Sequence, residues 1–439
     1  MFHKAPCFSS GDVRNGFDFE HVLQGIILSL NTSEYTRCTV LKCDCLCSVA
    51  THRQGYFFVK MKTYKFRLRP SKSQRTKLMQ TLELCRWVFN ETLATRKNAW
   101  EQDKKSISLY DTNKLLTSWK KEKPELNQVH SQVLQNVQER VDLAFQSFFR
   151  RVKAHEAEVG YPRFKGHNRY DSFTFKQSGF DLLENDLRVS KIGTLKIIQH
   201  RPIEDTHRVK TMTIQRDAVG NWYACFACEV EPRPMPFNKR SSPVDDRAVG
   251  IDVGLTTFAK LSNGIPVDNP RFFRRDEYEP GRAQRRYSKD KTPKRRKVIA
   301  HIHQRIANRR KDFAHKLSRE WVNRYGAIFL ENLSIKNMMK NHQLAKSIGD
   351  AAWRQLMQYI LYKAADAGRV CELVDPRGTS QRCSGCQTVV QKDLSVRVHD
   401  RPECGLVIDR DLNAAVNIER LGLESLGYAL EAPAFRHGE

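Results

Sequence analysis

The sequence predicts a multi-domain α+β protein in which a small β-barrel with a helical insert precedes an α/β domain that contains a cysteine-rich segment. Strand-like alternation at residues 61–70 and within 170–231 flanks a strongly helical stretch at 71–160. After a linker at 232–247, apolar strand-like runs and helical patterns follow one another, as in α/β domains. The length of 439 residues suits several domains of ~100–200 residues each.

The charge balance points to a polyanionic partner. Lysine and arginine number 75 against 49 aspartate and glutamate residues, a formal net charge of +26. A well-solvated surface is the alternative, but the excess is one-sided and gathers in runs, as nucleic-acid-binding proteins require.

Targeting signals are absent from the sequence pattern. The best apolar stretch, Val22–Leu30, is shorter than the ~20 residues of a membrane span, and the N-terminus lacks the features of a secretory signal. We therefore expect a protein that works inside the cell and binds no membrane. Its 12 cysteines would then be metal ligands or ordinary thiols rather than disulfides.

Residues 1–60 differ from the rest of the chain. They lack sustained apolar periodicity and C-x2-C spacing, although they contain Cys7, Cys38, Cys43, Cys45 and Cys47. Three interpretations compete: a cysteine-rich module, a poorly ordered appendage, or a start codon placed upstream of the true start at Met61. We favour the last, because structure signals begin directly after Met61.

The first folded part begins with a strand. Residues 61–70 alternate so that one strand face is basic, and Pro70 ends the pattern. Ser71 or Ser73 can then cap a helix, which opens a helical, basic insert at 71–160. Further strands of the barrel are expected at Ser172–Phe175, Leu187–Val189, Leu195–Ile197, Val209–Ile214 and Trp222–Val230.

Two segments are candidates for nucleic-acid contact. Residues 161–170 alternate aromatic rings with cations, which suits phosphate contact and base stacking, although a loop packed on the body beneath is an equal alternative. Residues 271–320 combine a basic face with an apolar helical stripe. From these and neighbouring segments the expected contacts are Arg67, Arg86, Arg163, Lys165, Arg285, Arg286, Arg295 and Arg296.

Three acids suggest chemistry. Asp252 interrupts an apolar strand, Glu331 ends another, and Asp411 lies in what looks like the first turn of a helix. An unpaired charge inside an apolar strand is costly unless a cation meets it. Paired Mg²⁺ ions need a few carboxylates that converge from different elements, so this trio could hold two such ions. Asp409 is a rival for the third position.

These residues occur within motifs that resemble the TnpB (OrfB) proteins of bacterial insertion sequences, which are RNA-guided DNA nucleases related to type V CRISPR effectors. The resemblance covers nearly all of 61–439. The motifs are Tyr64–Leu68, Cys85–Asn90, Pro162–Gly166, Gly250–Gly254, Glu331–Leu333, Thr379–Cys386 and Asp409–Ala415. The resemblance implies a wedge-like barrel at 61–70 and 170–231, a RuvC-like domain of ribonuclease H fold at 248–375 and 405–425, and a zinc-ribbon-like segment at 376–404. Residues 426–439 would be a tail.

In this resemblance Asp252, Glu331 and Asp411 are the catalytic acids. The cysteine pattern departs from the family. Cys383 and Cys386 form one C-x2-C pair, whereas Arg401 stands where the pair of Cys404 would begin. A guanidinium cannot bind zinc, so either His399 completes a Cys₃His set or zinc binding is weak or absent.

The residues alone predict a basic, multi-domain, metal-dependent enzyme that acts on nucleic acid. The resemblance implies more: an RNA-guided, Mg²⁺-dependent DNA endonuclease of an insertion sequence, located in the bacterial cytoplasm at the nucleoid. Its partners would be DNA and a guide RNA from the same element, and a homodimer is left open. A strand-joining transposase and a non-catalytic nucleic-acid-binding regulator are the alternatives. Fold does not separate the first two, because ribonuclease H folds support both reactions.

Overall fold

The computed structural model describes residues 60–156, 158–204, 207–230, 248–391, 393, 396–401 and 403–428, which belong to one compact unit. The expectations for residues 1–60 and for the linker at 232–247 fall almost entirely outside these residues, as does most of the tail at 426–439. Across the described part of the chain, no helix is long and apolar enough to cross a membrane.

The first sheet is antiparallel and nearly closes into a barrel. Its order is β2-β6-β7-β1-β5-β4-β3. The two edge strands are consecutive in the chain, and the rings of Phe175 and Phe180 lie 6.3 Å apart, so the sheet curls until its edges approach. The strands are β1 (Lys60–Arg69), β2 (Ser172–Phe175), β3 (Phe180–Leu182), β4 (Asp186–Val189), β5 (Gly193–Ile198), β6 (Arg208–Arg216) and β7 (Trp222–Val230). The sequence did not predict β3.

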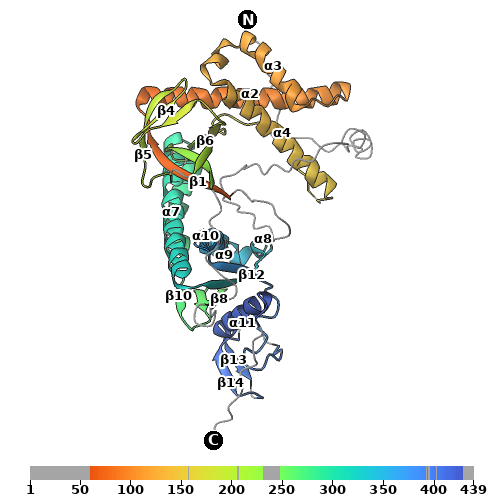
Figure 1. Cartoon of the computed structure of the whole chain (residues 1–439), viewed down its shortest axis with the longest axis vertical. Helices are drawn as coiled ribbons and strands as arrows, with labels where there is room; N and C mark the ends of the chain where they lie inside the picture. The colour runs from red at the N-terminus through yellow and green to blue at the C-terminus, as the bar shows by residue number, and fades with distance from the viewer. Residues whose placement is uncertain are drawn as a thin grey trace. The chain divides into compact units, whose positions relative to one another are not determined.

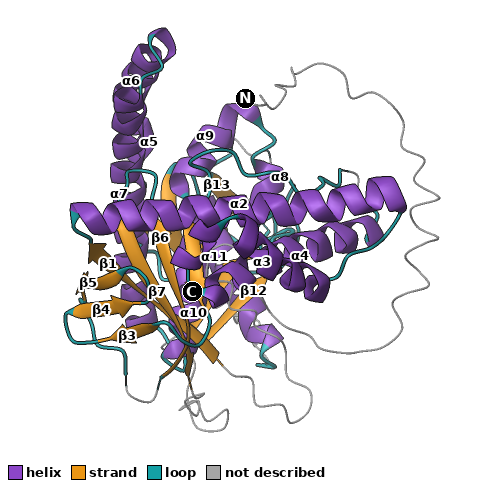
Figure 2. Cartoon of the chain, turned by 90° about the horizontal axis from the view of Figure 1, so that it is seen from above, coloured by secondary structure: helices purple, strands orange, loops and turns teal. Residues whose placement is uncertain are grey.

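The helical insert packs on this sheet. It consists of α2 (Lys72–Asp103), α3 (Leu109–Glu122), the 3₁₀ helix η1 (Pro124–Gln128) and α4 (Ser131–Lys153). Ser71 begins α2 with a capping box, since its hydroxyl accepts from Gln74 N and the Gln74 side chain accepts from Ser71 N. Figure 2 shows α2 beside α4.

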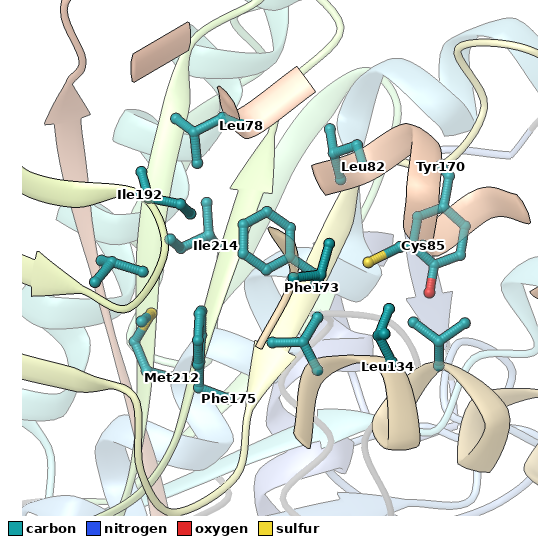
Figure 3. Packing of buried hydrophobic residues seen from close by; sticks show 14 of the residues in the cluster. Leu78, Leu82, Cys85, Leu134, Tyr170, Phe173, Phe175, Ile192, Met212 and Ile214 are labelled. Carbon is teal, nitrogen blue, oxygen red and sulfur yellow. The ribbon is translucent and has the colours of Figure 1, made fainter. Parts of the chain in front are cut away.

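Sheet and insert share one hydrophobic core. Figure 3 shows Leu82 of α2 and Leu134 of α4 close to Phe173 of β2. In β1 the alternation is as predicted: Tyr64, Phe66 and Leu68 are buried, while Lys65, Arg67 and Arg69 are exposed.

The second sheet is mixed. Its order is β10-β9-β8-β11-β12, with β8, β11 and β12 parallel and β9 antiparallel to its neighbours. The strands are β8 (Ala248–Val253), β9 (Thr257–Leu261), β10 (Pro266–Asp268), β11 (Ala327–Glu331) and β12 (Val370–Val374). A separate hairpin, β13 (Val398–Arg401) with β14 (Leu406–Asp409), leads into α11 (Arg410–Ser425). Figure 1 shows these elements in chain order by colour.

Helices cover both faces of the second sheet. One face packs on α7 (Pro293–Arg324) and α10 (Trp353–Asp366) through a core that includes Ile251, Leu330 and Trp321. The other packs on α11 through a smaller core that includes Phe329, Ile418 and Leu423. The remaining helices are α5 (Phe272–Arg275), α6 (Tyr278–Lys289), α8 (Ile335–Met338) and α9 (His342–Ala351).

Two glycines let α11 approach the sheet. A Cβ at Gly250 of β8 would lie 2.1 Å from the Ala415 carbonyl oxygen, and a Cβ at Gly422 of α11 would lie 2.0 Å from the Phe329 ring. Real Cβ atoms do not approach neighbours so closely, so both positions need a residue without one. The contact between α11 and the sheet is therefore made partly by backbone.

Replacing Gly422 with alanine should destabilise the protein. The new methyl group would overlap the buried ring of Phe329, and overpacking of this kind costs ~1–3 kcal/mol or more. Gly349→Ala in α9 is the matched control, because a Cβ there meets nothing nearer than 3.9 Å. In thermal unfolding, Gly422→Ala should lower the midpoint while Gly349→Ala leaves it unchanged or raises it. Equal midpoints would contradict the close packing of α11.

Candidate active site and cysteine cluster

Register brings two predicted acids together. Strands β8 and β11 pair in parallel, with Gly250 opposite Phe329 and Ile251 opposite Leu330. The next residues along the two strands are Asp252 and Glu331. Because side chains alternate between faces, both acids point to the side on which Phe329 packs against α11. The sheet thus places Asp252 and Glu331 side by side on the face that α11 covers.

The helix supplies the third acid. Asp411 lies in the first turn of α11, and its charge acts on Asp252. Asp409, the rival in the sequence, is the N-cap: its Oδ1 accepts a hydrogen bond of 2.9 Å from Leu412 N, and its side chain is exposed. Capping engages Asp409, whereas Asp411 belongs to the acid cluster.

Burial makes this cluster electrostatically costly. Burial, followed by repulsion from Glu331 and then Asp411, raises the pKa of Asp252 well above its ordinary value, while Arg410 acts in the opposite direction. Burial also raises the pKa of Glu331, against the hydrogen bond from Thr379. Carboxylates that repel one another in a buried site are suited to a bound cation, and oxygen ligands suit Mg²⁺.

Two arginines flank Asp411 on the hairpin side. Arg410 Nη2 lies 3.2 Å from Asp411 Oδ1, and Arg397 Nη1 lies 3.9 Å from Oδ2. Arg410 also donates from its backbone N to the Arg397 carbonyl over 2.8 Å. The segment that carries the third acid is therefore held against the strand of the hairpin.

Three of the predicted zinc ligands converge. The sulfur atoms of Cys383, Cys386 and Cys404 all lie within 4.8 Å of one another. Hydrogen bonds from Thr388 lower the pKa of Cys386 to about 6, which favours the thiolate that binds metal. His399 is fully buried on β13 but is not a member of this group, so its role as a fourth ligand stays a prediction.

The two halves of the cluster have the same backbone turn. Gln387 N donates to the Cys383 carbonyl over 2.9 Å, and Gly405 N donates to the Arg401 carbonyl over 2.8 Å. The residue after the second cysteine has positive φ in both turns, 63° at Gln387 and 71° at Gly405. Arg401 therefore occupies the position that Cys383 has in the first turn. Its guanidinium pairs with Glu403 over 3.0 Å.

Arg86, one of the predicted nucleic-acid contacts, bonds other residues of the protein. It forms an ion pair with Glu83, and its Nη1 donates to the Lys165 carbonyl over 3.1 Å. Asn90 bonds the same residue twice, donating to its carbonyl over 3.0 Å and accepting from its N over 2.7 Å. Two sequence motifs thus form one clamp, which fixes the loop that carries exposed Arg163 and Phe164. The sequence did not predict this clamp.

The other predicted cations lie on helices α6 and α7 and on β1. Arg285, Arg286 and Arg296 are exposed. Arg295 bridges the two helices, since its Nη1 donates to the Arg286 carbonyl over 2.6 Å. Arg67 donates to Asn221 Oδ1 over 2.7 Å from an exposed position. The structure therefore leaves most of these cations accessible.

One residue at the acid cluster was missed. The Thr379 hydroxyl donates to Glu331 Oε1 over 2.6 Å from a buried position. A threonine has no chemistry that a sequence scan would single out. The available signal was its place as the first residue of the motif Thr379–Cys386.

Comparison with known families matches three stretches of the chain. Residues 61–105 match a helix-turn-helix domain of the OrfB IS605 type, residues 226–342 match the OrfB IS605 family described as a probable transposase, and residues 353–418 match the Cas12f1-like TNB domain.

Relatives and solved structures agree with these matches. A putative RNA-guided DNA endonuclease of Streptomyces pristinaespiralis is 33% identical over 372 residues, which span 82% of this chain and 89% of the relative. The putative RNA-guided DNA endonuclease InsQ of Escherichia coli (strain K12) is 29% identical over 83% of this chain and 92% of its own.

Among solved structures, the Cas12f1 chain of a complex with sgRNA and target DNA superposes with a TM-score of 0.51 at 14% identity, covering 80% of this chain and 83% of that one, which shows a similar fold. On the strength of the relative that matches over most of both lengths, this chain belongs to the TnpB (OrfB) family of insertion-sequence-encoded RNA-guided nucleases.

Proposed function

We propose that this chain is an RNA-guided, Mg²⁺-dependent DNA endonuclease of an insertion sequence, with Asp252, Glu331 and Asp411 as its catalytic acids. The observation that carries the proposal is the placement of these three carboxylates at the ends of the neighbouring strands β8 and β11 and in the first turn of α11, where the charges of Glu331 and Asp411 act on Asp252. The relatives named as RNA-guided DNA endonucleases support the guide and the substrate.

The topology of the second sheet supports a RuvC-like domain. Numbered within that domain, the strand order is 3-2-1-4-5 with only the second strand reversed, which is the arrangement of ribonuclease H folds. In this proposal the nuclease domain covers 248–375 and 405–425, and the segment 376–404 is a zinc-ribbon-like insertion. The barrel and its helical insert hold the nucleic acids.

Each acid has a distinct surrounding. The charges of the other two carboxylates act on Asp252, the Thr379 hydroxyl orients Glu331, and Arg410 and Arg397 hold Asp411. When bound, a pair of Mg²⁺ ions would supply an activated water and stabilise the leaving oxygen of the phosphodiester. The exposed cations hold backbone phosphates, while base pairing with the guide selects the sequence.

The cysteine cluster supports a weakened zinc site. Three thiols supply three of the four ligands of a structural zinc, and the fourth position is held by Arg401, which has no lone pair to donate. With three thiols and a guanidinium in the fourth place, the residues present fit the metal only in part. We propose a structural rather than catalytic role for this segment.

Strand joining by a transposase is the second candidate, since one matching family is described as a probable transposase. The same acids could serve both reactions. The two differ in product: a hydrolytic nuclease leaves cut ends, whereas a transposase joins an end to a new strand.

Asp252→Ala should abolish Mg²⁺-dependent cutting of a guide-matched plasmid and leave RNA binding intact, because it removes one of the three proposed metal ligands. The matched control is Asp409→Ser, which keeps a capping side chain and should retain cutting. Cleavage gels, with RNA retention on the purified protein, measure both. Cutting by Asp252→Ala, or loss of RNA binding as well, would contradict the assigned role, and joined products would favour the transposase.

Without divalent metal, the cluster should make folding stability depend on pH. The folded state binds protons on Asp252 and Glu331 more tightly than the unfolded state does, because both pKa values are raised. The free energy of unfolding should therefore fall as pH rises above the ordinary carboxyl pKa, 3.8 for Asp252, through the raised folded-state pKa.

Denaturation in EDTA at several pH values measures this fall. Asp252→Asn should flatten it, and Mg²⁺ should restore stability to the wild type. An unchanged pH dependence in Asp252→Asn would show that the repulsion is relieved by other means.

Arg401→Cys should raise zinc occupancy, because it completes a Cys₄ set on a turn whose backbone already matches that of the first pair. Zinc per chain, measured by mass spectrometry after dialysis, should increase relative to the wild type. Arg401→Ser is the control that removes the guanidinium without adding a thiol. Equal occupancy in all three proteins would indicate that His399, or no further ligand, completes the site.

A further inference from the structure

Thr379 links the first cysteine turn to an acid. Its side chain is 4% exposed, and its hydroxyl lies 2.6 Å from Glu331 Oε1 and 3.2 Å from the Pro376 carbonyl. A hydroxyl has one proton to donate, and the shorter contact, to the carboxylate, is the stronger bond. The bond fixes one oxygen of Glu331.

Asn417 fixes the backbone of Thr379 in turn. From α11, its amide nitrogen donates to the Thr379 carbonyl over 2.8 Å and to the Arg382 carbonyl over 2.6 Å. The side chain is 2% exposed, so these bonds replace its hydration. Both amide hydrogens are used on the segment that leads into the cysteine turn.

Asn413 repeats the contact one turn earlier on the same helix face. It is fully buried, donates to the Arg382 carbonyl over 2.8 Å, and accepts from Ser384 N over 2.8 Å. Asn413 follows Asp411 by two residues. Through these bonds, the helix that carries Asp411 holds the segment that orients Glu331.

We infer that Thr379, Asn413 and Asn417 form a brace that sets the position of Glu331 relative to Asp411, and that the cysteine segment acts on cleavage through it. The three are positioning residues, since only Thr379 touches an acid and none belongs to the acid cluster. The inference rests on the proposed role of Glu331 and Asp411 as metal ligands. It gives a function to motif residues around the cysteines and the acids that the nuclease proposal does not use.

The brace predicts a change in metal binding rather than in guide binding. Thr379→Val keeps the shape of the side chain and removes the hydroxyl. Loss of a hydrogen-bond partner of a metal ligand typically costs ~10–100-fold in metal affinity or activity. Thr379→Val should therefore weaken Mn²⁺ binding and raise by a similar factor the Mg²⁺ concentration needed for half-maximal cutting. Electron paramagnetic resonance on the full chain with its RNA measures Mn²⁺ binding.

Matched variants separate positioning from general stability. Thr379→Ser retains the hydroxyl and should restore Mn²⁺ affinity. Thr92→Val removes another buried threonine hydroxyl, which donates to the Val88 carbonyl over 2.7 Å, and should leave Mn²⁺ binding unchanged. Asn413→Ala touches no acid, and should weaken Mn²⁺ binding in the same direction. It also serves as the second test if Thr379→Val does not fold.

The outcomes are distinguishable. Wild-type Mn²⁺ affinity in folded Thr379→Val, or in folded Asn413→Ala, would overturn the brace while leaving the nuclease proposal in place. Equal weakening in Thr379→Val and Thr379→Ser would also overturn it, because the hydroxyl would then be irrelevant. If the wild type bound no more Mn²⁺ than Asp252→Ala, the proposed function itself would fail, and the brace with it.

Discussion

The close approach of α11 to the second sheet is the constraint on which the acid cluster depends. Two of the three carboxylates are fixed by strand register, but the third lies on a helix and can reach them only if that helix lies almost in contact with the strands. Gly250 and Gly422 make this possible by removing the atoms that would hold the backbones apart. The same contact of α11 with the sheet therefore forms the small core around Phe329 and Ile418 and brings Asp411 to the other two acids.

The same arrangement explains how a basic protein can have an acidic centre. A net charge of +26 draws polyanions to the surface, and the exposed arginines on α6 and α7 extend that field. The partly buried acids, in contrast, would repel a phosphate unless a cation neutralised them. In the proposed function this division would keep binding and chemistry apart: the surface would hold the phosphodiester, and the acids would act on it once they hold metal.

The sequence predicted most of what periodicity and register determine. The alternation of β1 and a serine cap directly after Pro70 follow from local patterns. The contacts that it could not predict join segments far apart in the chain. Arg86 is a residue type that often contacts phosphate, but its guanidinium pairs with Glu83 and donates to the backbone carbonyl of Lys165. No local pattern identifies Lys165 as that partner. Likewise, Thr379 carries no charge and becomes informative only when β11 brings Glu331 to it.

Arg401 shows how a metal-site fold can persist while its ligand set is incomplete. The second turn keeps the backbone hydrogen bond and the positive φ of the first, although its leading residue cannot bind zinc. Contacts that need no metal also hold the segment in place. The hydrogen bonds that join Asn413 and Asn417 to the backbone of Arg382 and Ser384 are suited to this, because both asparagine side chains are buried. In this view the helix that presents Asp411 also supports the cysteine segment, so loss of a zinc ligand would weaken the segment without releasing it from the acids.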